Sequence, residues 1–128
     1  MTQDERESLD SLTEATLSAI FEVANTLGCG FLEKVYERAL FRELKMRDIP
    51  AAQQVAFPVH YKGFLIGEYF ADIVVDNAVA LELKSVEHLT NDHMAQCLNY
   101  LRASGLKVCL LVNFQKPKVE WRRVVSDF

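Results

Sequence analysis

Hydrophobic residues recur at helical spacing in three stretches of the chain, with polar residues on the opposite face of each. This spacing places the apolar side chains on one stripe of a helix and predicts three amphipathic helices. Ser11 and Glu14 have the spacing of a capping box, and Gly28 and Gly105 are placed to end the first and third helices. The predicted helices are Leu9–Leu27, Phe31–Arg47 and a third from Thr90 or Asn91 to Ala103.

The remaining stretches alternate apolar and polar residues or are continuously apolar, which predicts β-strands. Pro58 interrupts the first of them and favours an edge strand or a bulge, because proline has no N–H to give to a neighbour. The order of elements is helix, helix, antiparallel meander, helix, strand, strand, and it predicts an α+β fold with a mixed sheet between helices. The predicted strands are Gln53–Tyr61, Phe64–Val75, Ala78–Ser85, Lys107–Phe114 and Val119–Val125.

Charged residues interrupt the apolar pattern of the hairpin FADIVVDNAVALELKS, residues 70–85. A two-residue turn would pair Val75 with Ala78 and turn Asp72 away from Glu82. A three-residue loop pairs Val75 with Val79 and sets Asp72 across from Glu82. We expect the second register, because the first would bury Asp72 among leucines.

Two carboxylates on one face of a hairpin repel each other unless positive charge lies between them. A divalent cation suits this position, and Lys84 lies beside Glu82 on the same face. The alternative is a buried ion cluster without a catalytic role, although ion clusters rarely recover the free energy lost on desolvation. We expect Mg²⁺, with Mn²⁺ as a substitute, because Mg²⁺ takes oxygen ligands and keeps several waters.

Composition is consistent with an intracellular globular protein. The chain has 128 residues, of which half are hydrophobic, and we expect one domain over residues 1–128. No stretch is apolar enough to cross a bilayer, and the acidic start MTQDERES is unlike a leader, so a cytoplasmic location without membrane partners is expected. Three cysteines without Cys-x-x-Cys spacing favour reduced thiols. The net charge of −4 disfavours nonspecific coating of nucleic acid.

Three motifs resemble a known family. Asp72 followed by Glu82-Leu83-Lys84 resembles the signature of the PD-(D/E)XK nuclease superfamily, with Ala71 where the name has proline. Gly30-Phe31-Leu32-Glu33-Lys34-Val35-Tyr36 matches the Gly-x-x-Glu-x-x-Tyr signature of its GxxExxY branch, and Gln96 to Tyr100 matches the Gln-x-x-x-Tyr element of RecB-type members. Nearly the whole chain resembles the GxxExxY family.

The resemblance implies a restriction-endonuclease-like core with one acidic metal site. Asp72, Glu82, the carbonyl of Leu83 and the helix carboxylate Glu33 would then hold the metal, and Lys84 would position the attacking water. Further expected site residues are Gln96 and Tyr100, which would brace the site or contact the scissile backbone, and Tyr36 and His93 as substrate contacts. The alternative interpretation of Glu33 is an ordinary acidic residue in the first turn of a helix, and that of His93 is a local hydrogen-bond partner at the N-terminus of its own helix.

The function expected from these residues is metal-dependent hydrolysis of phosphodiester bonds in DNA or RNA. Two alternatives stay open. One is a catalytically silent module of the same fold that binds nucleic acid or a protein, and the other is a nuclease subunit that needs a homo-oligomer or a partner. The sequence does not choose between DNA and RNA.

Overall fold

The computed structural model describes residues 1–126, in which three helices and five strands alternate much as the sequence predicts. Every predicted element is present, with ends that differ by a few residues except at the first helix. The elements are α1 (Gln3–Leu27), α2 (Glu33–Met46), β1 (Ala51–Tyr61), β2 (Phe64–Val75), β3 (Val79–Lys84), α3 (Asn91–Ser104), β4 (Val108–Asn113) and β5 (Glu120–Val125).

The first helix begins six residues earlier than predicted. The backbone N–H of Glu5 donates to the Thr2 hydroxyl at 3.1 Å, so Thr2 caps α1 and the expected capping box at Ser11 is wrong. The third helix starts at the predicted cap, because the Thr90 hydroxyl accepts from the N–H of His93. It ends at Gly105, whose φ of 75° is the left-handed conformation that glycine adopts without strain.

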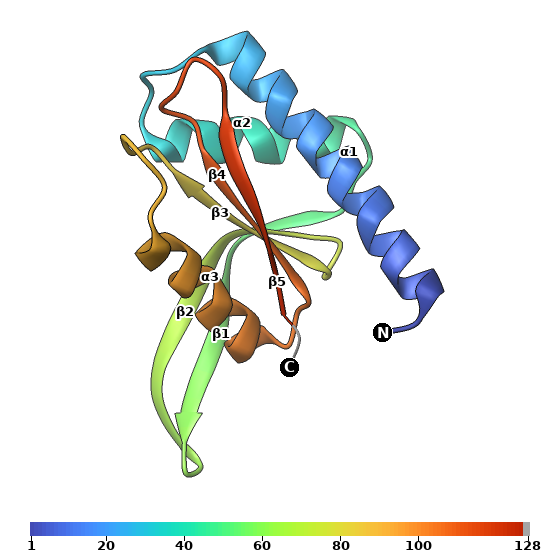
Figure 1. Ribbon diagram of the computed structural model, residues 1–128, viewed down its shortest axis with the longest axis vertical. Coiled ribbons are helices and arrows are strands. Elements are labelled where there is room, and N and C mark those ends of the chain that lie inside the picture. The colour runs from blue at the N-terminus through green and yellow to red at the C-terminus, as the bar shows by residue number, and fades with distance from the viewer. Residues whose placement is uncertain (127–128) are drawn as a thin grey trace.

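The five strands form one mixed sheet in the order β1-β2-β3-β4-β5. Only β3 and β4 are parallel, and α3 makes the crossover between them. The predicted edge position of β1 is confirmed, with Pro58 opposite Glu68 of β2. The paired strands β1 and β2 extend beyond the helical layers as a long hairpin (Figure 1).

Helices cover both faces of the sheet, as predicted (Figure 1). On one face, α1 and α2 bury Ile20 and Leu40 against a cluster that includes Leu110 of β4. On the other face, α3 buries Leu101 against a second cluster that includes Leu111, the next residue of β4. All six residues of β4 are therefore buried, which explains why the sequence shows no alternation there.

The cysteines are reduced, as expected. Cys97 of α3 and Cys109 of β4 lie in the second cluster, whereas Cys29 is exposed. Over the described residues no helix combines the length and hydropathy needed to cross a membrane.

Candidate active site

The hairpin between β2 and β3 has the register expected from its charges. Val75 pairs with Val79, and the three-residue loop between them contains Asp76 and Asn77, both with positive φ. Backbone pairing stops after Ile73 opposite Leu81. Continued by one step, this register places Asp72 across from Glu82.

Asp72 occupies the point where β2 and β3 cease to pair. Its Oδ2 accepts the backbone N–H of Leu83 at 2.7 Å, so a side-chain oxygen replaces the carbonyl that a continued ladder would offer. Its Oδ1 accepts from the side-chain amide of Gln54 at 3.3 Å. These two bonds fix the orientation of the carboxylate. The carboxylate of Asp72 thus takes over the hydrogen bonding at the point where the backbone pairing of β2 and β3 ends.

Glu82 lies on the face of the sheet that α3 covers, and only 4% of it is exposed. Burial, hydrogen bonding to Asp72 and the negative charge of Asp72 together raise the pKa of Glu82 to about 9. A hydrogen bond with Tyr100 and the charge of Lys84 oppose this rise in the pKa. Glu82 therefore carries a proton at neutral pH in the metal-free protein.

Lys84 follows Glu82 on the same face, and its Nζ donates to Oε1 of Gln96 at 3.2 Å. Tyr100 lies one helical turn after Gln96 and is buried next to Glu82. Burial, together with the neighbouring Glu82, raises the pKa of the Tyr100 phenol. The hydroxyl of Tyr100 consequently keeps its proton and can donate. The structure thus brings together Asp72, Glu82 and Lys84 with two residues of α3.

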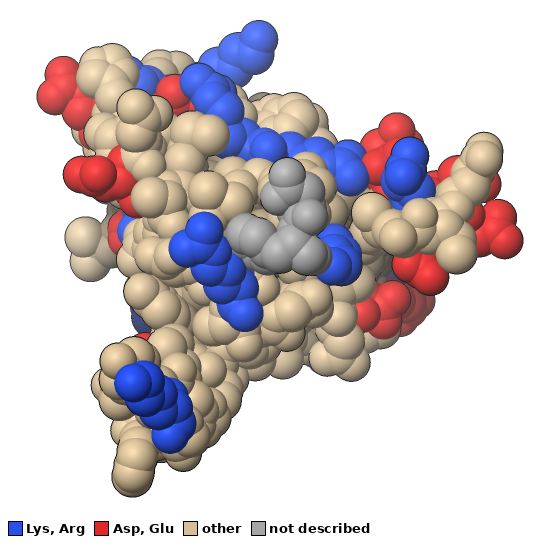
Figure 2. All heavy atoms as spheres, turned by 60° about the horizontal axis from the view of Figure 1, so that its bottom comes forward, with Lys and Arg blue, Asp and Glu red and all other residues tan. Residues whose placement is uncertain are grey.

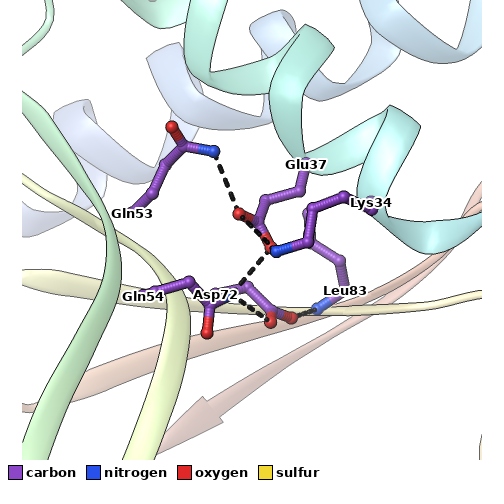
Figure 3. A network of polar contacts seen from close by, with 6 residues as sticks. All are labelled: Lys34, Glu37, Gln53, Gln54, Asp72 and Leu83. Carbon is purple, nitrogen blue, oxygen red and sulfur yellow. Dashed lines mark hydrogen bonds and ion pairs between the residues drawn. The ribbon is translucent and has the colours of Figure 1, made fainter.

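A second polar network reaches Asp72 from α2, and its centre is Glu37 (Figure 3). Glu37 is 4% exposed and pairs with Nζ of Lys34 at 3.1 Å. It also accepts from the amides of Gln53 at 2.9 Å and Gln54 at 2.8 Å. Because Gln54 contacts both Glu37 and Asp72, it links α2 to the hairpin.

The helix carboxylate connected to Asp72 is therefore Glu37 and not the predicted Glu33. Glu33 is exposed and lines a surface hollow with Ser85 and Gln115, beside the end of β3. Within residues 1–126, no three His, Cys, Asp or Glu side chains lie close enough together to hold a metal ion. The structure thus does not bring Glu33 together with Asp72 and Glu82.

The two expected substrate contacts have structural partners. Tyr36 is fully buried, stacks on Phe114 at 4.4 Å between ring centroids, and donates from its hydroxyl to the carbonyl of Gly28 at 2.6 Å. This position leaves no surface for a substrate, so the prediction for Tyr36 is wrong. His93 accepts the N–H of Thr90 through Nδ1 at 3.0 Å and completes the capping box of α3, the local role considered from the sequence.

The sequence contains a signal for the buried position of Glu37. Glu37 precedes Leu40 by three residues and Leu44 by seven, so it lies on the inward stripe of α2. A carboxylate at such a position needs buried partners. Gln54 gives no comparable signal, because its position depends on a φ of 49° that interrupts the alternation of β1.

The residues present fit a divalent cation. Oε2 of Glu82 is buried and has no hydrogen-bond partner among the described residues, so an ionised Glu82 leaves it without a donor. Protonation of Glu82 reduces the cost of burying this oxygen, and a cation bound between the two carboxylates would do the same. Leu83 adds a third oxygen, because the N–H and carbonyl of a strand residue point to the same side and its N–H points to Asp72.

Comparison with known proteins identifies the family and the fold of the chain. A family model described as the PD-(D/E)XK nuclease superfamily matches residues 10–124. No curated protein matches the chain. A solved structure titled "Crystal structure of SSO0001" superposes with a TM-score of 0.61 at 16% identity, over 74% of this chain and 50% of the other. This chain thus spans about half the length of that protein, and the likeness concerns the fold.

Proposed function

Because the chain belongs to the PD-(D/E)XK nuclease superfamily, we propose that it is a metal-dependent nuclease that hydrolyses phosphodiester bonds of DNA or RNA. The observation that carries the proposal is the buried Glu82 oxygen without a partner, next to Asp72 and on the same face as Lys84. Few buried polar atoms of native proteins lack a partner, and a bound ion is one of the established explanations for such an atom. We place the chain in the GxxExxY branch on the basis of Glu33 and Tyr36 in their signature.

Asp72, Glu82 and the carbonyl of Leu83 would hold the cation, with Mg²⁺ preferred and Mn²⁺ as a substitute. When bound, the ion would supply a polarised water and neutralise charge that develops on the phosphate. The chain prepares the site before any ion enters, since hydrogen bonds from Gln54 and Leu83 already fix Asp72.

Lys84 would act on the attacking water and on the phosphate oxygens. Its ammonium has three N–H groups, of which one is directed to Gln96. The remaining N–H groups can orient a water and stabilise negative charge on the phosphate in the transition state. Gln96 is then a positioning residue, because it acts through Lys84. The Tyr100 hydroxyl would donate to Glu82 and keep that carboxylate in place.

The test is incubation of the purified protein with single- and double-stranded DNA and RNA, in Mg²⁺ or Mn²⁺ and in EDTA. We expect cleavage with either metal, none in EDTA, and loss of cleavage in Glu82→Gln and Lys84→Met proteins. Cleavage that persists in both variants would come from a contaminant. Metal binding without cleavage of any substrate would favour the silent binding module over an enzyme.

A further inference from the structure

The hairpin of β1 and β2 carries exposed apolar side chains that nothing else within residues 1–126 covers. We call residues 56–70 the hairpin arm. It projects past the helices at the bottom of Figure 1. Five of its large apolar side chains are about half to three-quarters exposed, which is more than scattered single surface residues would give. They are Tyr61 at 60%, Phe64 at 74%, Leu65 at 59%, Ile66 at 63% and Phe70 at 49%.

The hairpin arm has almost no charge. It contains one lysine, Lys62, and one acid, Glu68, and β1 has no Asp, Glu, Lys or Arg over all its 11 residues. In Figure 2 the tip of the arm is a tan surface with a single basic side chain, whereas acidic side chains gather around the start of α1. Lys62 lies over the Tyr61 ring, 5.5 Å from its centroid. Charged side chains or proline on an edge strand normally prevent it from pairing with a strand of another chain, and on β1 that residue is Pro58.

We propose that the hairpin arm is the interface of a homodimer, in which the arms of two copies pack against each other. A symmetric interface brings identical surfaces together, so it tolerates apolar residues and disfavours like charges. The arm meets both conditions. A nucleic-acid partner would require several cations for the phosphates, and the arm offers one.

The exposed area is of the right order for such an interface. At about 200 Å² for each large side chain, the five apolar residues expose roughly 600 Å² per copy, divided between the two faces of the arm. Specific interfaces bury about 800 Å² per partner, so the partner must cover both faces of the arm, and the flanking residues must add about a quarter of the area. Pro58 cannot donate to a strand added at the edge of β1, which favours side-chain packing between arms over a continuous sheet.

The experiment is sedimentation equilibrium of the whole chain across the micromolar range, without nucleic acid and in EDTA. We expect a dimer for the natural sequence and a monomer for Phe64→Glu/Ile66→Glu. The matched control is Met46→Glu, which changes an apolar residue of α2 that is 69% exposed and should stay dimeric. Circular dichroism and melting show whether each variant folds, and Phe64→Ser/Ile66→Ser tests the same surface with a milder change.

A natural sequence that stays monomeric, or folded arm variants that stay dimeric, would overturn the proposal. A monomeric natural protein whose arm variants lose binding to nucleic acid would also overturn the proposal, because the arm would then be a surface for the substrate. The measurement does not depend on cleavage. Failure of the nuclease assay therefore leaves the dimer proposal unaffected, and failure of the dimer proposal leaves the nuclease proposal unaffected.

Discussion

The carboxylate of Asp72 and the backbone N–H of Leu83 join β2 to β3 at 2.7 Å, immediately beyond the last backbone pair of the two strands. This bond has two consequences. It holds Asp72 next to Glu82, and it turns the backbone of Leu83 toward the carboxylates. The stability of the hairpin and the proposed metal binding therefore both depend on Asp72. Different substitutions at Asp72 can remove one of these roles without the other.

We expect Asp72→Asn to remain folded and to lose cleavage by about two orders of magnitude or more, because the amide oxygen still accepts from Leu83 while the negative charge is gone. Asp72→Ala should also lose about 1–2 kcal/mol of unfolding free energy, since the Leu83 N–H is left without a partner. Urea unfolding and a cleavage assay measure both. Equal stability of the two variants would show that the hydrogen bond between Asp72 and Leu83 does not stabilise the protein.

The free energy of unfolding should depend on pH through Glu82. Its pKa is about 9 in the folded protein and close to 4.5 when unfolded, so the folded state holds one more proton between these values. Stability should therefore be highest at and below about pH 4.5, as far as this group is concerned, and fall as pH rises toward 9. The slope for one proton is at most about 1.4 kcal/mol per pH unit.

The control for this slope is Glu82→Gln, which cannot titrate and should lose the Glu82 contribution to the pH dependence. The measurement is urea unfolding in metal-free buffer from pH 5 to pH 9. Parallel curves for the natural protein and Glu82→Gln would contradict the raised pKa.

Metal binding should release a proton from Glu82, and Tyr100 should set how easily this happens. The hydrogen bond with Tyr100 lowers the pKa of Glu82, so Tyr100→Phe should raise that pKa further. Mn²⁺ affinity near neutral pH should then fall, and its pH dependence should move to higher pH. Titration calorimetry in buffers of different ionisation enthalpy measures affinity and proton release together.

Tyr69→Phe is the matched control for Tyr100→Phe. The Tyr69 ring packs against Tyr100 with centroids 5.2 Å apart and is absent from the groups that shift the pKa of Glu82. It should bind Mn²⁺ as the natural protein does. If both variants shift the affinity equally, packing around Tyr100 and not its hydroxyl is responsible.

Glu37 and Glu33 lie one helical turn apart on α2 and should respond differently to substitution. Glu37→Gln weakens the ion pair with Lys34 and the link through Gln54, so it should cost about 1–3 kcal/mol of stability and reduce cleavage. Glu33→Gln changes an exposed residue and should alter stability by less than about 0.5 kcal/mol.

Metal affinity decides whether Glu33 nevertheless belongs to the site. Unchanged Mn²⁺ affinity in Glu33→Gln is the expected result from its place on the rim of the surface hollow. A clear loss of affinity with unchanged stability would mean that Glu33 joins Asp72 and Glu82 when metal binds, as the resemblance implies. It would then correct the role that we assign to Glu37.

The sequence alone determined the order of the elements, the mixed sheet and the hairpin register that sets Asp72 across from Glu82. Periodicity identifies the helices because one stripe of each must be buried, and the charge pattern selects the hairpin register because only one register puts Asp72 beside Glu82. The sequence also predicts that Gln96 and Tyr100 share one face of α3, since they are one helical turn apart.

Only the tertiary structure decided which carboxylate of α2 supports the site and what Tyr36 does. Helical spacing places Glu33 and Glu37 on neighbouring positions, and the choice between them depends on how α2 crosses the sheet and on the irregular backbone at Gln54. The protrusion of the hairpin arm was equally invisible, because strand alternation gives the length of a strand but not where the covering helices end.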